Sequence, residues 1–327
     1  MPTEARKRLP DRVCPVGRGS GRGGLARAIG RDFRAEHLIH HQTGEVRLTD
    51  GRALAYAEWG SPNGGALLHF HGIPDGRFGW GAGSACEDRG LRLITVDRPG
   101  VGRSDPKPGR SVADWASDVE ELAERLGVDR FSVSGLSAGG PYALACAVRL
   151  EGRVESVALI SAVGRLDQPG FVPQMHTARA WWLAAHLPRA MALLYSANGH
   201  LTRRSPTVAR RLVAAGLPKI DREVINRPDL APRLQHAYVE AARSGGSRGL
   251  AEDMRVVLAP WGFDPAEILA PAFVFHGRRD AIAPPTHAEH WIETLPDARP
   301  AWFEDAGHLL IEDHVEVILD ALAVSGK

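Results

Sequence analysis

The feature that most limits how this chain can fold is a serine held between closely spaced glycines, Gly135-x-Ser137-x-Gly139. A short apolar run, 131–134, precedes it, and an Ala- and Leu-rich segment that suits a helix, 141–148, follows it. A serine on so tight a strand-to-helix turn lies in a strained backbone conformation, and only small residues fit around it. The pattern therefore predicts a turn that lifts the hydroxyl of Ser137 off the edge of a sheet.

This pattern is short, so its context decides what it means. In a chain with 36 glycines it should occur by chance about 0.2 times, and an ordinary glycine-rich loop is the alternative interpretation. The strand pattern before it and the helix pattern after it favour a strand-turn-helix. Pro141 supports that choice, because it falls in the first turn of the predicted helix, where a missing N–H costs little.

Length and composition indicate a globular protein. The 327 residues are 44% apolar and 24% charged, and they suffice for one large domain or two smaller ones. The formal net charge of +1 gives no overall attraction for nucleic acid or for an anionic membrane. The longest uncharged run, 131–148, contains Pro141 and several glycines, so it does not suit a membrane span. We therefore predict no membrane partner and no nucleic-acid partner.

The charge is nevertheless unevenly distributed. Residues 1–35 contain nine Lys or Arg and three Asp or Glu without apolar periodicity, which predicts a disordered basic extension. Contact of this extension with RNA is the alternative. No apolar signal-peptide core follows the N-terminal charges. The cysteines Cys14, Cys86 and Cys146 are too few and too widely spaced for a disulfide framework or a metal site. Both observations favour a cytoplasmic location.

Alternating strand and helix patterns predict an α/β fold, in which a mostly parallel sheet is covered by helices on both faces. Asp50-Gly51, between the first two strand patterns, predicts a β-hairpin. The predicted strands are 45–49, 52–59, 66–70, 91–97, 131–134, 154–160, 272–275 and 299–303. Helices are predicted between them at 80–89, 111–126, 285–295 and 310–323.

The alternation stops near residue 164. From there to residue 262 the sequence predicts only helices, which include 175–187, 189–197, 206–215 and 230–243. We interpret this part as a helical cap inserted into the fold. The predicted domains are a basic extension (1–35), a core (36–164 and 263–327) and a cap (165–262).

Three residues suited to nucleophilic catalysis each follow a predicted strand: Ser137, Asp280 and His308. A catalytic serine needs a base that takes its proton and an acid that orients that base. In a parallel sheet the carboxyl ends of the strands share one edge, where ligands usually bind. The order Ser, Asp, His therefore predicts a catalytic triad, with Asp167 as the alternative acid.

These features resemble the α/β-hydrolase family, and in particular the broad grouping of cap-bearing esterases, lactonases, epoxide hydrolases and iminopeptidases. The resemblance covers residues 45–323 and implies fold and triad but not substrate. It rests on five motifs in the family's order: His71-Gly72-Ile73-Pro74, Asp97-Arg98-Pro99-Gly100-x-Gly102-x-Ser104, Gly135-x-Ser137-x-Gly139-Gly140, His276-Gly277-x-x-Asp280 and Gly307-His308.

The resemblance implies that Ser137 is the nucleophile, His308 the general base and Asp280 its orienting acid. It also implies an oxyanion hole made by the backbone N–H groups of Ala138 and Ile73. The candidate substrate contacts are Leu136, Trp181 and Trp182, and packing within the cap is the alternative for the two tryptophans.

Two departures from the family narrow the prediction. Epoxide hydrolases and haloalkane dehalogenases have an aspartate at the turn, and Ser137 argues against both reactions. The glycine expected in an iminopeptidase-like loop is replaced by Ile73. The pair His69-x-His71 has no nearby Asp-His pair to complete a metal site, so we predict no metal and no cofactor, and expect His71 to support the oxyanion loop.

The sequence therefore predicts a serine hydrolase that cleaves an ester, thioester or lactone of a small, mostly apolar molecule through an acyl-enzyme on Ser137. One alternative is another reaction on the same triad, such as C–C bond hydrolysis, perhydrolysis or aminopeptidase activity. A second alternative is a ligand-binding protein with vestigial turnover. Neither the substrate nor the oligomeric state follows from the sequence.

Overall fold

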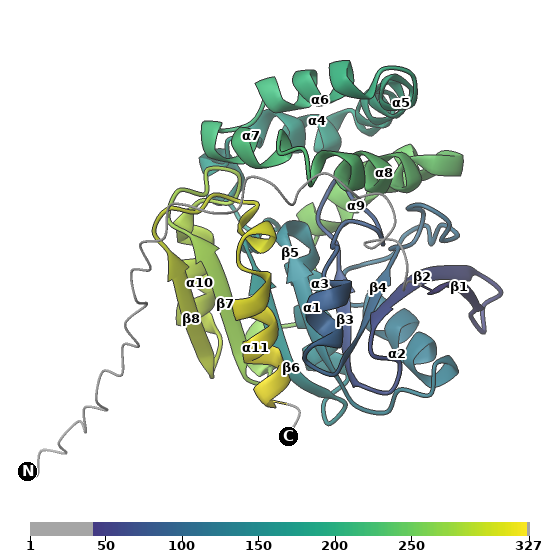
Figure 1. The fold of residues 1–327 in the computed structure, drawn as a ribbon, viewed down its shortest axis with the longest axis vertical. Helices are drawn as coiled ribbons and strands as arrows, with labels where there is room; N and C mark the ends of the chain where they lie inside the picture. Colours follow the sequence, from purple (N-terminus) through teal and green to yellow (C-terminus); the bar gives the residue numbers. More distant parts are fainter. Residues whose placement is uncertain (1–41, 326–327) are drawn as a thin grey trace, which may run out of the picture. The chain divides into compact units, whose positions relative to one another are not determined.

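The computed structural model describes residues 42–325, which form an eight-stranded sheet with helices on both faces (Figure 1). The strand order is β1-β2-β4-β3-β5-β6-β7-β8. Strand β2 is antiparallel to β1 and β4, and the strands from β4 to β8 are parallel. This confirms the predicted fold class. The strands are β1 (Gln42–Arg47), β2 (Ala53–Gly60), β3 (Gly65–Phe70), β4 (Leu91–Val96), β5 (Phe131–Leu136), β6 (Val154–Ile160), β7 (Ala272–Gly277) and β8 (Ala298–Phe303).

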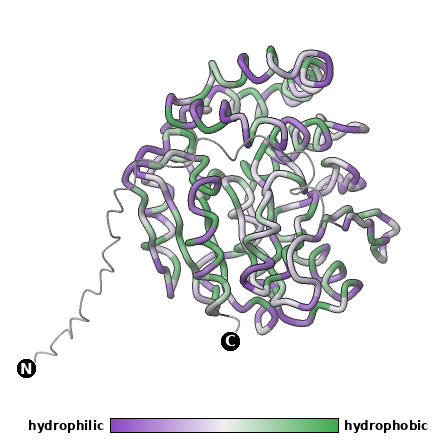
Figure 2. Tube along the Cα trace, in the orientation of Figure 1, coloured by the Kyte–Doolittle hydropathy of each residue, from purple (hydrophilic) through white to green (hydrophobic). Residues whose placement is uncertain are grey.

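Each face of the sheet has its own apolar core, because successive strand residues point to opposite faces. Leu68 and Ile94 belong to the core shared with α2, α3 and α10, whereas Leu67 and Leu93 belong to the core shared with α1 and α11. Figure 2 shows this apolar character along the central strands. The helices are α1 (Gly83–Glu87), α2 (Trp115–Arg125), α3 (Gly140–Arg149), α10 (Pro285–Thr294) and α11 (Val315–Ser325).

The chain between β6 and β7 contains helices and no strand in the described residues, and we call it the cap. Figure 1 shows most of it beyond the carboxyl ends of the parallel strands. The cap also contributes to the core, since Met254 and Val257 of its last helix are buried with the side chains of α2 and α3. Its helices are α4 (Ala178–His186), α5 (Pro188–Arg204), α6 (Pro206–Ala215), α7 (Lys219–Ile225), α8 (Ala231–Ala241) and α9 (Gly246–Leu258).

Several helix boundaries differ from those predicted. Helix α1 has five residues instead of the ten predicted. Helix α2 begins at Trp115 instead of Ser111, because the backbone N–H and the hydroxyl of Ser111 both donate to the Asp114 carboxylate in a preceding turn. Helices α7 and α9 lie in the segment predicted to be helical, but their bounds were not predicted. The basic extension and Cys14 lie outside the described residues, within which no helix is long and apolar enough to cross a membrane.

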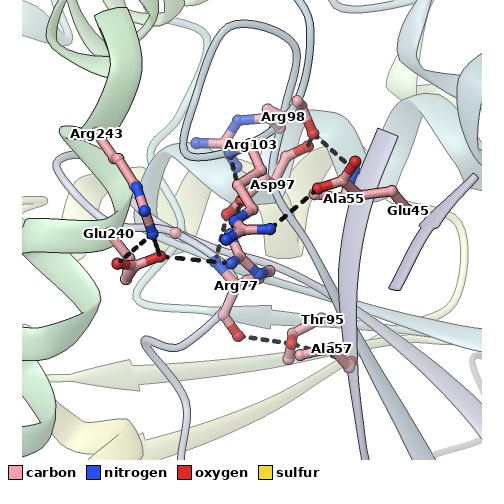
Figure 3. A network of polar contacts seen from close by, with 12 residues as sticks. Glu45, Ala55, Ala57, Arg77, Thr95, Asp97, Arg98, Arg103, Glu240 and Arg243 are labelled. Carbon is pink, nitrogen blue, oxygen red and sulfur yellow. Dashed lines mark hydrogen bonds and ion pairs between the residues drawn. The ribbon is translucent and has the colours of Figure 1, made fainter. Parts of the chain in front are cut away.

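A network around buried Asp97 connects the sheet to the cap (Figure 3). The Asp97 carboxylate accepts hydrogen bonds from the backbone N–H of Arg77 at 2.7 Å and of Arg103 at 3.2 Å, and it is ion-paired with the Arg77 guanidinium. Arg77 also pairs with Glu240 of α8 at 3.6 Å, and Glu240 pairs with Arg243. The loop after β4 is therefore fixed to both the loop around Arg77 and the cap.

Candidate active site

Ser137 lies on a strained turn between β5 and α3. Its φ of 53° is in the left-handed region, which non-glycine residues rarely occupy. The glycines beside it are required by close backbone contacts: a Cβ on Gly135 would lie 2.4 Å from the carbonyl oxygen of Gly139, and one on Gly139 would lie 2.1 Å from that of Phe70. The local sequence therefore folds into the predicted strand-turn-helix, in which a 3₁₀ turn at Ser137–Gly139 leads into α3.

The imidazole of His308 is hydrogen-bonded to Asp280. The distance between His308 Nδ1 and Asp280 Oδ2 is 2.8 Å, and both side chains are buried. The other carboxylate oxygen, Oδ1, accepts the backbone N–H groups of Ile282 and Ala283, each at 2.8 Å. Because the carboxylate is held on both oxygens, it fixes His308 with Nδ1 as the donor and leaves Nε2 free to accept a proton.

A second buried histidine flanks the same carboxylate. His276 Nε2 lies 2.8 Å from the carbonyl oxygen of Ala283 and 3.5 Å from Asp280 Oδ2. Burial lowers the pKa of His276, although the charge of Asp280 acts in the opposite direction. A neutral His276 donates Nε2–H to the carbonyl oxygen of Ala283 and thereby helps to hold the turn that contains Asp280. Because it is neutral, His276 does not compete with His308 for the charge of Asp280.

The three predicted triad residues follow β5, β7 and β8, so they lie at the same edge of the parallel sheet. The alternative acid, Asp167, instead forms two hydrogen bonds with Arg165, at 2.8 and 2.7 Å. In the described residues no hydrogen bond joins Ser137 to His308. Such bonds are often long in ligand-free enzymes and shorten in the substrate complex.

The loop 71–74 runs beside Ser137, since a Cβ on Gly72 would lie 3.4 Å from the Cβ of Ser137. The carbonyl oxygen of Gly72 accepts hydrogen bonds from His71 Nδ1 at 2.8 Å and from Arg98 Nη2 at 3.2 Å. In a planar trans peptide the C=O and N–H groups point in opposite directions. These two donors therefore fix the direction of the Ile73 N–H, the group predicted to bind an oxyanion.

The charges around this loop determine the protonation of His71. Burial lowers the pKa of His71 well below its ordinary value, and the positive charge of Arg98 lowers it further. The neutral imidazole donates from Nδ1 to Gly72 and accepts the backbone N–H of Arg98 at Nε2, at 3.4 Å. His71 therefore supports the loop 71–74 from within, in the position that the sequence predicted.

Arg98 is held by a carboxylate from the cap that the sequence analysis missed. Asp253 of α9 accepts Arg98 Nε at 2.7 Å on one oxygen, and Arg110 Nη2 at 2.9 Å and the Tyr142 hydroxyl at 2.6 Å on the other. Burial by itself raises the pKa of Asp253, but the two guanidinium groups outweigh it, so the pKa lies below its ordinary value. The carboxylate is therefore charged, and it connects α9 to the loop 71–74 through Arg98.

Glycines in α9 make this contact possible. A Cβ on Gly249 would lie 1.9 Å from the carbonyl oxygen of Gly100, so only a glycine allows the helix to approach the loop after β4 so closely. The same approach brings Asp253, one turn further along α9, against Arg98. No local motif marks Asp253 in the sequence.

A second cap carboxylate, also missed, lies beside His308. Asp221 of α7 is buried, and its Oδ1 accepts the backbone N–H of Leu309 at 2.9 Å. Burial raises the pKa of Asp221. For His308, burial favours a lower pKa, but the charge and hydrogen bond of Asp280 and the charge of Asp221 outweigh it, so the pKa of His308 is raised.

The predicted substrate contacts occupy three different environments. Leu136 ends β5 directly before Ser137 and is half-buried. Trp181 is buried in the apolar core, whereas Trp182 is 56% exposed and stacks on His186 with ring centroids 4.7 Å apart. The structure therefore places Leu136 next to Ser137 and gives Trp182 a solvent-exposed position, so we do not retain Trp182 as a substrate contact.

His69 and His71 do not share a ligand site. His69 Nδ1 lies 2.9 Å from the Ser134 hydroxyl, and the His69 ring packs on Trp80. Burial lowers the pKa of His69 to about 3. Within the described residues, no three His, Cys, Asp or Glu side chains are grouped so that they could hold a metal ion.

A cavity of about 800 Å³ lies away from the triad. It is lined by the loop 99–110 and by residues around the start of α9, including Arg243 and Arg248, and none of Ser137, Asp280 or His308 contributes to it. We therefore do not assign the substrate of the triad to this cavity.

Comparison with known proteins identifies the family. The family model described as alpha/beta hydrolase fold matches residues 65–315, and the chain belongs to this family. An uncharacterized protein from Mycobacterium tuberculosis is 26% identical, over 89% of this chain and 83% of that protein. An esterase from Thermogutta terrifontis has a similar structure, with a TM-score of 0.64, 23% identity, and coverage of 88% of this chain and 100% of that chain. For an epoxide hydrolase the TM-score is 0.67, the identity 20%, and the coverage 86% and 97%.

The buried Asp253 should contribute strongly to stability. In Asp253→Ala the guanidinium groups of Arg98 and Arg110 remain buried without their counter-charge, so we expect a loss of about 3–5 kcal/mol in the free energy of unfolding. The matched control is Asp297→Ala, which removes an exposed ion pair with Arg299 and should change stability by less than about 0.5 kcal/mol. Urea denaturation measures both, and equal losses would contradict the role given to Asp253.

Proposed function

We propose that this protein is a serine hydrolase that cleaves an ester, thioester or lactone of a small, mostly apolar molecule. The observation that carries the proposal is the 2.8 Å hydrogen bond between His308 and Asp280, at the sheet edge where Ser137 occupies its strained turn. A strained serine, a fixed histidine and a charged acid are the components of nucleophilic acyl transfer.

In the proposed reaction, His308 Nε2 takes the proton of Ser137 Oγ while the oxygen attacks the substrate carbonyl carbon. Asp280 stabilises the resulting imidazolium, which then protonates the leaving alcohol or thiol as the carbonyl re-forms. Water enters, gives its proton to His308 and attacks the acyl-enzyme. The acid is released when Ser137 takes the proton back.

The negative oxygen of the tetrahedral intermediate would be bound by the N–H groups of Ala138 and Ile73. The Ala138 amide lies at the start of the helical segment that follows Ser137, where backbone N–H groups are unpaired and carry partial positive charge. The Ile73 amide belongs to the peptide whose carbonyl is bound by the Arg98 guanidinium. A cation at the carbonyl end polarises that peptide and makes its N–H a stronger donor.

Apolar substrate groups are supported by the residues next to the serine. Leu136 and Ile73 are both half-buried. Leu136 directly precedes Ser137, and Ile73 follows Gly72, which lies beside Ser137. The cap is helical, and its buried Trp181 and Met175 join the apolar core. These surroundings favour the acyl or alkyl part of an ester over a charged group.

The first prediction concerns the nucleophile. A fluorophosphonate probe should label the wild-type protein covalently, because an activated serine attacks phosphorus, and should not label Ser137→Ala. Ser134→Ala is the matched control, since Ser134 is a buried serine of β5, the strand directly before Ser137, and is hydrogen-bonded to His69. In-gel fluorescence measures the labelling. Equal labelling of wild type and Ser137→Ala would rule out this nucleophile.

The second prediction concerns the acid. Asp280→Asn should keep the fold but disturb the tautomer and orientation of His308, with a loss of about 10⁴ in kcat. Asp167→Asn is the matched control and should retain nearly full kcat, because Asp167 is paired with Arg165. Hydrolysis of p-nitrophenyl esters measures kcat. If Asp167→Asn were the inactive variant, the assignment of the acid would be reversed.

The third prediction concerns pH. Only neutral His308 accepts a proton, so kcat/KM should rise with one proton loss, at a midpoint above the ordinary imidazole value of about 6.5 because the pKa of His308 is raised. Asp221→Asn removes a negative charge that favours the imidazolium, so it should move this midpoint to lower pH. The control, Glu223→Gln, changes an exposed carboxylate of the same helix and should leave the profile unchanged. A midpoint unmoved in Asp221→Asn would contradict the coupling.

A further inference from the structure

The outer helices of the cap expose an unusual number of large apolar side chains. Nine such side chains are exposed in the described part of the chain, and seven of them lie between residues 182 and 213. We call these seven residues the cap apolar surface: Trp182, Leu187, Leu193, Leu194, Val208, Leu212 and Val213. They belong to α4, α5 and α6 and the residue joining α4 to α5, and these helices contact one another in sequence order. In Figure 1, α5 and α6 form the layer of the cap farthest from the sheet.

In helix α5 the exposed apolar residues follow a regular helical spacing. Its inward face carries Met191 and Thr202, which are buried. On its outward face, Leu193 and Leu194 lie at 69% and 57% exposure, and the exposed positions 190 and 197 are alanines, which gives the spacing i, i+3, i+4, i+7. A helix with an ordinary solvent face would carry charged or polar residues at these positions. This helix therefore has a second apolar stripe that nothing in the described chain covers.

The charged side chains of the segment that carries this surface are all of one sign. Residues 178–215 contain six arginines and no aspartate or glutamate. None of the six forms an ion pair within the described residues, whereas Arg52, Arg98 and Arg227 elsewhere are paired with carboxylates. The six arginines are Arg179, Arg189, Arg203, Arg204, Arg210 and Arg211.

We propose that the cap apolar surface associates with an anionic lipid surface, with the cap lying on the membrane. Helices that lie in the interface combine Leu and Trp on one side with Lys or Arg on the other, and they bind by apolar burial together with attraction to anionic headgroups. Here the apolar stripe and the unpaired arginines occur on the same three helices. This inference departs from the absence of a membrane partner that the sequence predicted, because the net charge of the whole chain hides the local excess of arginine.

A second copy of the chain fits this surface less well. In a symmetric dimer the same surface would face itself, so the arginines of both copies would meet without any acidic residue of 178–215 to neutralise them. Anionic headgroups neutralise the arginines and accept the apolar side chains at the same time. The association would place the cap where apolar esters are concentrated, and only this consequence depends on the proposed function.

The experiment is co-sedimentation of the full-length protein with vesicles. Binding to phosphatidylcholine vesicles that contain phosphatidylglycerol should exceed binding to pure phosphatidylcholine, and salt should weaken it. Leu193→Gln should lower the partition coefficient about ten-fold, as expected when a leucine no longer enters the apolar layer. The matched control is Leu269→Gln, because Leu269 is 71% exposed but lies outside the cap helices, and it should bind as the wild type does.

A second pair of variants tests the charges. Arg203→Gln with Arg204→Gln should weaken binding about 25-fold, since each basic residue near an anionic surface contributes about five-fold. The control, Arg130→Gln with Arg255→Gln, lowers the net charge equally at exposed arginines outside 178–215 and should change binding little. Ser137→Ala should bind as the wild type does, which separates this test from the test of catalysis.

Three outcomes would overturn the proposal. Binding that is equal in the wild type and both cap variants, but lost when the arginines of 1–35 are replaced, would assign it to the N-terminal segment. Sedimentation equilibrium showing a dimer that Leu193→Gln dissociates, without vesicle binding, would identify a second copy as the occupant. Binding to an acidic polypeptide without vesicle binding would identify a protein partner. Melting temperatures of all variants establish that they are folded.

Discussion

The buried ion pair between Arg98 and Asp253 is the interaction on which the arrangement of this protein most depends. Both side chains are fully buried, and removing two charges from water is expensive unless each is completely paired. The pairing is complete here, because Asp253 also accepts Arg110 and Tyr142 while Arg98 donates to the carbonyls of the loop 71–74. One carboxylate of the cap thereby fixes the loop after β4, the start of α3 and the proposed oxyanion loop.

The cap also affects His308, in this case through its pKa. Sequence reasoning leaves the sign of the pKa shift of His308 open, because burial lowers it and a neighbouring acid raises it. In the structure the pKa of His308 is raised, mainly by the charge and the hydrogen bond of Asp280, and Asp221, a carboxylate of α7, adds a further negative charge. The cap therefore contacts both halves of the proposed machinery, the oxyanion loop through Asp253 and the base through Asp221.

The fold and the catalytic candidates could be predicted because their signals are local. The glycine pattern around Ser137 spans only five residues of sequence, and His308 and Asp280 each follow a strand with a recognisable apolar pattern. Asp253 could not be predicted, since its partner Arg98 is 155 residues away. The bounds of helix α9 could not be predicted for a related reason. Its glycines weaken the helical pattern, yet Gly249 is required by the loop that packs on it.

The tryptophans of α4 show a second reason why part of the structure could not be predicted from the sequence. Trp181 and Trp182 are neighbours in sequence, so on a helix they point about 100° apart, and one is buried while the other is 56% exposed. Periodicity alone does not say which side of a helix faces the body when both sides carry apolar residues. In α4 and α5 both sides do, and the packing of Trp181 and Met191 identifies the inward side.

The close approach of Gly249 to Gly100 has a consequence for recombining this protein with its relatives. The helical insertion between β6 and β7 is the segment that such a recombination would exchange. Here the insertion does not end where its outer helices end, because α9 supplies a buried charge to the core. A chimera that replaced the whole helical segment would leave Arg98 and Arg110 without a counter-charge. An exchanged segment should therefore end at α8 (Ala231–Ala241). Helix α9 of this protein should stay with its own sheet, so that Asp253 remains paired with Arg98.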